Sequence, residues 1–487
     1  MTNKEVQTAQ RDLSMAISGA VATTGDAAYA RTITIDNGRV NRRPQLVVIP
    51  ADTKDVATTV RYCHKQGIRL TVKSGGHSAA GYCLNFEGIV LDLRSLNAIA
   101  SIDGGAGLSV GMGARWIQLY SYIQERQSDR IIIGGGCGGV GIGGFLLGGG
   151  YSFASRSFGL ACDSVKRMEL VAASGEIHQL HDKLTNKEEA DLFWALKGGG
   201  GGNFGIVTNV NLRLHTTPSA SMMMGQVNFP FYRIHEILPF YNNWVSTLPN
   251  EMAVYGMLRR FPDPRQGGRP TLFIRLFPVY NGKFSDGEAL LRPLINLQPT
   301  SIELYAMTLP QWEKYVGNDT LVDGRSAYIR SVMLPPKSLN ADFTEICMKY
   351  LGMAPSADSY IVWTHTGGAI KNSDTNTSCF AHRDAEFLFE LKSIWSPAAL
   401  ESDRANIEWS VNFFDELEAY AQGAYVNYID PLLTDWQYKY YRDSYPRLMK
   451  IKKHVDPSDV WGFQQGIGST FSPGRQVPLD LSPLTRT

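Results

Sequence analysis

Two side chains that could act as nucleophiles stand beside runs of glycine. His77 follows Ser74-Gly75-Gly76 at the end of an apolar, β-branched segment, and Cys137 lies inside a Gly-Gly-Gly-Cys-Gly-Gly stretch. A single cysteine or histidine is more often a packing residue than a reactive one. A cysteine with glycine on both sides, however, has no bulky neighbours to shield it. The sequence therefore favours a thiol that a ligand can approach.

The glycine tracts themselves need a physical reason. Residues 134–150 hold eleven glycines in seventeen positions, and a second tract follows at 197–208. Glycine costs about 0.5–1 kcal/mol relative to alanine inside regular structure. A flexible linker would carry serines and charges, whereas large apolar residues such as Ile142 and Leu146 interrupt this tract. The tracts indicate backbone placed against a flat or phosphorylated ligand, with N–H groups free to bind oxyanions.

These tracts fit a dinucleotide-binding fold poorly. Gly139–Gly143 matches Gly-x-Gly-x-x-Gly only approximately, and no amphipathic helix is expected after it. Asp163 lies near the distance at which such folds place an acidic residue. No Walker lysine is present, so both NAD(P) binding and nucleotide hydrolysis are disfavoured.

Composition limits the class of protein. The 487 residues have a formal net charge of +1, which gives no electrostatic case for nucleic acid or an anionic membrane. No apolar run approaches the roughly 18 residues of a spanning helix. The first residues are polar, so we expect a cytoplasmic protein, with secretion less favoured. The six cysteines are too sparse for a disulfide scaffold, and no metal site is expected.

The elements that must position these side chains fall into two regions. Residues 1–45 predict a helix and a polar connector, and the chain then alternates strands and helices up to about residue 215, with a helix at 53–67 and a hairpin turn at Gly175. Residues 220–420 predict an antiparallel sheet covered by helices on one face. Its expected strands are 221–229, 253–261, 271–280, 301–309, 326–334 and 359–367, and its expected helices are 231–248, 286–295 and 385–395. The fold class is therefore α+β with two lobes.

Five motifs occur in order along the chain. They are KSGGHS at 73–78, GCGGVG at 136–141, GGGYSFASRSFGLACDSV at 148–165, DLFWALKGGGGGNFGIVT at 191–208 and YVNYID at 425–430. This set closely resembles the berberine-bridge-enzyme-like branch of the vanillyl-alcohol oxidase/p-cresol methylhydroxylase flavoproteins, from about Asn41 to Ile467. The resemblance implies a PCMH-type FAD-binding domain made of residues 1–215 and 424–487, with a substrate-binding domain at 216–423 between them.

The resemblance also implies the cofactor, FAD, and its attachment. In the family the histidine of SGGHS is joined to the flavin 8α-methyl group and the cysteine of the second motif to flavin C6, so His77 and Cys137 imply bicovalent FAD. Such a flavin has a raised redox potential and a fixed ring in an open pocket. The other residues expected at the cofactor are Lys73, Ser74, Gly75, Gly76, Ser78, Gly136, Val140, Gly141, Gly143, Gly144, Gly149, Gly150, Ser152, Asp163, Gly205, Ile206, Val207 and Asn427.

Further positions carry implied roles in catalysis. Val140 matches the residue that gates oxygen in this family, which favours O2 as the electron acceptor. Tyr428 matches the tyrosine often assigned as catalytic base, and Tyr425 and His365 are second candidates for the catalytic pocket. A tyrosine with a pKa near 10 needs help from its surroundings to act at neutral pH. Phe145 departs from the pattern, because many members have histidine or another polar residue there.

The function implied is an oxidase. FAD would remove hydride from a C–H bond next to oxygen or nitrogen in a small organic or secondary-metabolite substrate, and O2 would yield H2O2. The alternatives are an oligosaccharide oxidase acting at the anomeric carbon, which is typically secreted, and a flavin scaffold without redox turnover. The partners expected are a small-molecule substrate and O2, with the chain as a monomer or homodimer.

Overall fold

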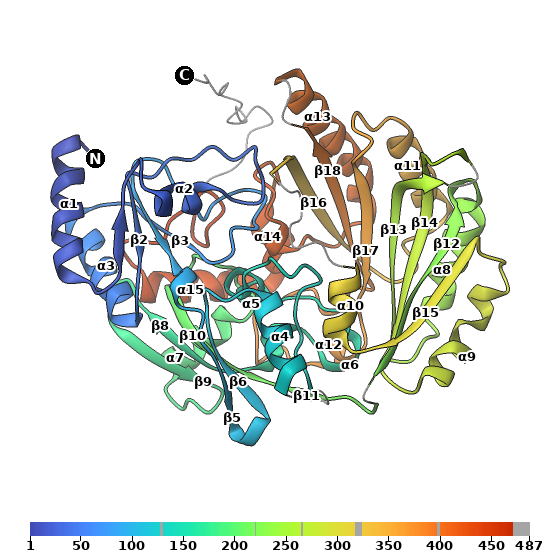
Figure 1. The fold of residues 1–487 in the computed structure, drawn as a ribbon, viewed down its shortest axis with the longest axis horizontal. Coiled ribbons are helices and arrows are strands. Elements are labelled where there is room, and N and C mark those ends of the chain that lie inside the picture. Colours follow the sequence, from blue (N-terminus) through green and yellow to red (C-terminus); the bar gives the residue numbers. More distant parts are fainter. Residues whose placement is uncertain (127–129, 220, 264–265, 317–323, 397–399, 471–487) are drawn as a thin grey trace.

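The computed structural model describes residues 1–126, 130–219, 221–263, 266–316, 324–396 and 400–470. These residues form two lobes, each with its own sheet structure and apolar core (Figure 1). The first lobe comprises residues up to about 216 together with the C-terminal elements from 424. The second lobe comprises the elements between 222 and 417.

A small sheet in the first lobe presents the segment that contains His77. Its strand order is β1-β2-β4-β3, and its strands are β1 (Ala20–Ala22), β2 (Leu46–Ile49), β3 (Leu70–Lys73) and β4 (Ile89–Asp92). Helix α3 (Thr53–Gln66) crosses from β2 to β3. It begins where the Asp52 carboxylate accepts from the Asp55 N–H, and it ends at Gly67, which adopts a φ of 64°. The crossover places the end of β3, and the loop after it, at one edge of the sheet.

A second, antiparallel sheet completes the first lobe. Its order is β5-β6-β10-β8-β9, with β5 (Ile99–Ile102), β6 (Gly107–Gly111), β8 (Val165–Val171), β9 (Ile177–His181) and β10 (Ile206–Arg213). Strands β7 (Arg130–Ile131) and β11 (His215–Thr216) form a separate pair. The helices of this lobe are α1 (Asn3–Ala16), α2 (Ala27–Ile33), α4 (Trp116–Arg126), α5 (Ile142–Leu147), α6 (Ser155–Phe158) and α7 (Lys187–Leu196).

The second lobe is built on one seven-stranded antiparallel sheet of order β15-β12-β14-β13-β17-β18-β16. The strands are β12 (Met222–Pro230), β13 (Met252–Asp263), β14 (Arg269–Tyr280), β15 (Ser301–Met307), β16 (Ser326–Leu334), β17 (Tyr360–His365) and β18 (Phe387–Trp395). Its outer face is covered by α8 (Ile234–Val245), α9 (Phe284–Ile295), α11 (Ala341–Gly352) and α13 (Leu400–Leu417) (Figure 1). The shorter α10 (Leu309–Val316) and α12 (Ala369–Asn372) contact α4 and α6 of the first lobe.

The two faces of this sheet have different roles. On β17, Ile361 and Trp363 belong to the core beneath the helices, whereas Tyr360 and Val362 pack toward the first lobe beside Ala79. Because successive side chains of a strand alternate between faces, the same division holds along each strand. Side chains that act between the lobes must therefore lie on the same face of the sheet as Tyr360.

The C-terminal elements return to the first lobe. Helices α14 (Trp436–Tyr441) and α15 (Tyr445–Val455) lie among its elements, and α15 contacts α7 (Figure 1). The buried Lys452 ammonium donates to the Asn203 carbonyl at 3.0 Å and pairs with Asp456 at 2.5 Å. These contacts fasten α15 to the segment around Asn203 in the first lobe.

The expected α+β architecture with a helix-covered antiparallel sheet is confirmed. The helix expected at 385–395 is wrong, because this segment is β18, and all nine of its residues are buried. Because both faces of this strand are buried, its apolar residues do not alternate strictly with polar ones, and the pattern does not distinguish it from a buried helix. The polar connector after α1 also contains β1 and α2, which the sequence did not indicate. None of the helices in the described ranges is long and apolar enough to cross a membrane.

Candidate functional site

The two glycine segments meet backbone to backbone. A Cβ atom on Gly75 would lie 2.2 Å from the Gly141 nitrogen, so neither residue can carry a side chain. Ser74 reinforces the contact, since its hydroxyl donates to the Met112 carbonyl at 2.7 Å and accepts from the Gly143 N–H at 3.3 Å. This packing brings the loop of His77 against the loop of Cys137.

His77 is almost buried and lies next to a carboxylate. Its side chain is 13% exposed, and its Nδ1 atom is 3.7 Å from Oδ2 of Asp36 without a hydrogen-bond partner. Burial lowers the His77 pKa, and the Asp36 charge acts against that shift. The ring is therefore held neutral, with a lone pair available for bond formation. Asp36 lies in the connector that the sequence left without a role.

Cys137 has the same neighbours. Burial raises the pKa of its thiol to about 11, with the Gly139 backbone and the Lys392 charge acting downward and the Asp36 charge acting upward. The Gly139 backbone also affects His77. The structure thus groups His77 and Cys137 around Asp36 and Gly139. Val140, the next residue of this loop, donates its N–H to the Cys137 carbonyl at 3.1 Å.

Tyr425 fastens the returning chain to the glycine tract. Its hydroxyl accepts from the Gly150 N–H at 2.9 Å and from the Asn427 amide at 2.8 Å. The same amide of Asn427 donates to the Phe145 carbonyl at 3.0 Å. A Cβ atom on Gly148 would lie 2.0 Å from the Asn427 oxygen, so glycine is required there. With these partners, the Tyr425 hydroxyl holds the loop in place.

Tyr428 lies beside a buried ion pair of the second lobe. Glu390 and Lys392 share one face of β18, and their side chains pair at 3.1 Å. The Lys392 ammonium is 5.6 Å from the centre of the Tyr428 ring and 5.9 Å from that of Tyr360. Glu390 and Lys392 lie on the same face of the sheet as Tyr360. Together with Tyr428 they therefore lie between the lobes, where the Lys392 charge also affects Cys137.

The surroundings of Tyr428 keep its hydroxyl protonated. Burial raises the Tyr428 pKa, Glu390 raises it further, and Lys392 acts in the opposite direction. For Lys392, burial favours the neutral form, but the charge of Glu390 outweighs it and the pKa is raised, so the ammonium persists. A neutral tyrosine next to a carboxylate can pass a proton on as it receives one.

The structure does not bring His365 to this group. His365 lies on the helix-covered face of β17, like Trp363. Its Nδ1 accepts from the Val254 N–H at 3.3 Å, and its Nε2 lies 3.3 Å from Glu386. Burial lowers the His365 pKa to about 4. With both ring nitrogens engaged away from Tyr428, His365 packs the second lobe.

Several residues expected at the cofactor also have structural contacts within the protein. The Lys73 ammonium points into the protein, donating to the Thr32 carbonyl at 2.7 Å. Ser152 is buried, and its carbonyl accepts from the Tyr255 hydroxyl. Gly205 precedes β10, and Ile206 and Val207 begin that strand, pairing with β8. Of the remaining positions, Gly76 and Ser78 lie in the loop after β3, Gly136 and Gly149 lie in the loops on either side of α5, and Gly144 lies within α5. Gly76 and Gly149 have φ values of 75° and 115°.

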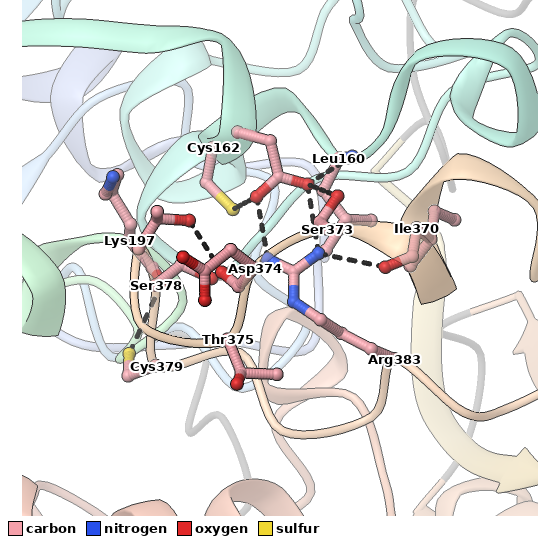
Figure 2. Close-up of polar contacts among 12 residues, drawn as sticks. Leu160, Cys162, Lys197, Ile370, Ser373, Asp374, Thr375, Ser378, Cys379 and Arg383 are labelled. Carbon is pink, nitrogen blue, oxygen red and sulfur yellow. Dashed lines mark hydrogen bonds and ion pairs between the residues drawn. The ribbon is translucent and has the colours of Figure 1, made fainter.

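Asp163 joins the two lobes. Its carboxylate accepts from both terminal nitrogens of Arg383, at 3.0 and 2.7 Å, and from Ser373 at 3.2 Å. Figure 2 shows Arg383 close to Ser373 and Ser378, and the Arg383 guanidinium also donates to the Ser378 hydroxyl. The pair is almost buried, with 5% and 11% of the side chains exposed. Asp163 therefore holds the lobes together, rather than joining the group at His77 and Cys137.

Another carboxyl group faces the Cys137 loop from the second lobe. Glu313 of α10 is 3% exposed, and neither of its oxygens has a hydrogen-bond partner among the described residues. One of them lies 3.2 Å from the position of a Cβ on Gly136. Burial raises the Glu313 pKa well above its ordinary value, so the group is neutral. Sequence gave no signal for it, because α10 carries no motif.

The residues present fit a flavin. The orphaned, buried Nδ1 of His77 is a nucleophile without a partner, Cys137 stands beside it, and the backbone at Gly144 and Gly201 has room around it. A flat ring could be joined to both side chains between the glycine loops and the inner face of β18. The acidic and basic pair of β18 would then face the ring.

Comparison with known proteins shows which domains the chain contains. Residues 44–181 match the model of an FAD binding domain, and residues 424–468 match the model described as berberine and berberine like. The chain therefore contains an FAD binding domain and a berberine-like C-terminal segment, and it resembles the berberine-bridge-enzyme-like FAD-linked oxidoreductases. It is thus a flavoprotein that uses FAD.

Individual relatives agree over nearly the whole length. The chain is 24% identical to the uncharacterized FAD-linked oxidoreductase YgaK of Bacillus subtilis (strain 168), covering 93% of this chain and 97% of the relative. It is 26% identical to berberine bridge enzyme-like C-1 of Nicotiana tabacum, covering 88% and 86%. The solved xylooligosaccharide oxidase from Myceliophthora thermophila C1, in complex with xylobiose, has the same fold, with a TM-score of 0.80 at 24% identity over 95% of this chain and 99% of that one.

Proposed function

We propose that the protein is an oxidase that removes hydride from a C–H bond next to oxygen or nitrogen in a small organic or secondary-metabolite substrate. The observation that carries this proposal is the group formed by Tyr428, Glu390 and Lys392, which faces the loop of Cys137. When bound, FAD supplies the hydride acceptor. The chain must then supply a group that receives the proton of the substrate hydroxyl or amine.

Tyr428 and Glu390 provide a path for that proton. Because the Tyr428 hydroxyl is protonated, it receives the substrate proton at its oxygen while its own proton moves toward the Glu390 carboxylate. Lys392 balances the charge of Glu390 at 3.1 Å and remains an ammonium throughout. A relay of this kind needs no free phenolate, which burial would make costly.

Attachment of FAD through both His77 and Cys137 is part of the proposal. The surroundings of the two side chains support it, since the Gly139 backbone and the Asp36 charge act on both and both are partly shielded from water. Acid precipitation should leave the flavin on the protein, and digestion with mass spectrometry should find one flavin joining both peptides. His77→Ala and Cys137→Ala should each leave one link. A wild-type protein that loses all its flavin to acid would refute the double attachment.

Oxygen is proposed as the electron acceptor. Val140 is half-buried and packs against the core of the first lobe, with its N–H and carbonyl bonded to Cys137 and Trp116 at 3.1 Å. Its side chain is a small branched group in the loop at which the flavin would be attached, and it leaves more room for O2 than leucine would.

An oligosaccharide oxidase acting at the anomeric carbon is the second candidate. The fold shared with the xylooligosaccharide oxidase favours it. A flavin scaffold without redox turnover is a third, disfavoured by the presence of His77, Cys137 and Tyr428 together. All three are separated by one measurement, which is peroxide release across panels of alcohols, amines, polyphenols and oligosaccharides. Turnover with a small alcohol, amine or phenol supports the leading proposal. Turnover confined to oligosaccharides supports the second, and flavin that no substrate reduces supports the third.

A further inference from the structure

The segment containing Asp36 is held against the His77 loop by its backbone. The Asp36 N–H donates to the Gly76 carbonyl at 3.1 Å, and the Asp36 carbonyl accepts from the Gly324 N–H at 3.1 Å. The neighbouring Asn37 amide donates to the carbonyls of Ala79 and Ala327 at 2.8 and 3.0 Å. These contacts tie residues 36–37 to both lobes, so the Asp36 side chain has a defined position independent of its charge.

That position places the Asp36 carboxylate beside His77. The Asp36 side chain is 5% exposed, and its Oδ2 atom lies 3.7 Å from Nδ1 of His77. Its negative charge also reaches the Cys137 thiol. Other charges that act on His77, those of Arg115 and Lys73, are positive and oppose protonation of the ring. Asp36 is thus the negative group that faces the imidazole.

We propose that Asp36 is the positioning residue for formation of the histidyl–flavin bond. It orients the His77 ring and stabilises the positive charge that develops on the imidazole as the bond forms. This inference rests on the proposed double attachment of FAD, and it concerns assembly of the enzyme rather than its turnover.

The attachment step balances with O2 as the oxidant. A ring nitrogen of His77 forms a bond to the 8α-methyl carbon, and one methyl C–H bond breaks. The imidazole then loses the proton of its other ring nitrogen, and the Asp36 carboxylate stabilises the positive charge of the ring until that proton leaves. The two electrons and two protons released pass to O2, giving H2O2. An opposite charge at about 4 Å favours the charged form of a group, which is the form that the imidazole passes through here.

The test isolates the histidyl bond in a Cys137→Ala background. Purified Cys137→Ala and Asp36→Asn/Cys137→Ala proteins are incubated with FAD in air, and acid-stable flavin on the His77 peptide is followed by fluorescence after denaturing electrophoresis and by mass spectrometry. We expect attachment to be at least about 10-fold slower in the double variant, because the attraction between the Asp36 carboxylate and the positively charged imidazole is lost. Total flavin, bound and released by acid, should remain close to one per chain.

A matched control and a second variant keep the result interpretable. Asp163→Asn/Cys137→Ala removes an equally buried carboxylate that pairs with Arg383, away from His77, and should attach flavin as fast as Cys137→Ala. Asp36→Glu should restore part of the rate, and it replaces the Asn variant if that protein does not fold. Equal attachment rates with and without the Asp36 carboxylate overturn the inference alone. Absence of acid-stable flavin from Cys137→Ala and from the wild type overturns the double attachment as well.

Discussion

The ammonium nitrogen of Lys392 lies 5.6 Å from the centre of the Tyr428 ring, although the two residues come from different lobes. Lys392 belongs to β18, and Tyr428 to the C-terminal segment that is bonded to the glycine tract through Tyr425 and Asn427. The proposed proton path therefore depends on how β18 of the second lobe packs against the C-terminal segment of the first lobe. Changes on either side should alter the same kinetic step.

Tyr428→Phe should slow flavin reduction by roughly 10²–10⁴-fold, the usual contribution of a positioned acid–base group. The ring remains, so folding and flavin attachment should survive. Glu390→Gln should have a similar effect, and the double variant should be little worse than either single one, because both act in one relay. Stopped-flow reduction under anaerobic conditions measures each rate.

Tyr425→Phe is the control for this experiment. The Tyr425 hydroxyl accepts from Gly150 and Asn427, so its loss should lower thermal stability and leave the pH dependence of reduction unchanged. A Tyr428→Phe protein that reduces its flavin at the wild-type rate, beside an impaired Tyr425→Phe protein, would assign the proton to Tyr425 instead.

Lys392→Met should move the rise of the pH–rate profile to higher pH. The positive charge of Lys392 lowers the Tyr428 pKa, and it also balances Glu390. Without it, Tyr428 holds its hydroxyl proton more tightly, so a higher pH is needed for that proton to move toward Glu390. Reduction rates at saturating substrate between pH 5 and 10 give the midpoint. A midpoint that stays in place, or moves downward, contradicts the role of Lys392.

Val140→Leu should slow reoxidation by air-saturated buffer while leaving reduction by substrate nearly intact. The larger side chain would fill space in the loop of Cys137, and oxygen must approach the flavin there. The two half-reactions are measured separately on the same protein. If both slow to the same extent, Val140 serves only in packing.

Asp163→Asn should lower the free energy of unfolding by about 3–5 kcal/mol, as expected when one partner of a buried ion pair is removed. The Arg383 guanidinium would be left between the lobes without its carboxylate. Glu408→Gln is the matched control, because its pair with Arg404 is exposed, at 76% and 58%, and should change the same free energy by less than about 1 kcal/mol. Denaturant titration compares the two, and equal losses would remove the special role of the interlobe pair.

Glu313→Gln should stabilise the protein at alkaline pH relative to the wild type. Burial raises the Glu313 pKa in the folded state, so the folded chain binds a proton that the unfolded chain releases above its ordinary pKa of 4.5. Wild-type stability therefore falls as the pH rises from that value toward the folded-state pKa. Glutamine cannot ionise, so the difference in melting temperature, variant minus wild type, should increase from pH 5 to pH 8. A constant difference would mean that Glu313 has a charge-compensating partner.

The sequence alone indicated the flavoprotein family, the cofactor FAD and the two residues proposed to attach it. His77, Cys137 and Tyr428 lie in short motifs whose glycines are required by local backbone contacts, such as that of Gly75 with Gly141. Such motifs can be recognised without knowledge of the fold. The alternating strands of the second lobe were equally visible, because one face of most strands is polar or aromatic.

Only the tertiary structure decided which other side chains join the site. Asp36 lies in a connector, Glu313 in a helix without a motif, and Glu390 and Lys392 in a segment whose continuous burial makes a strand read as a helix. The structure likewise turned His365 to the helix-covered face and paired Asp163 with Arg383. These roles depend on which face of a sheet each side chain occupies and on how distant segments pack together. Neither can be read from the local spacing of residues.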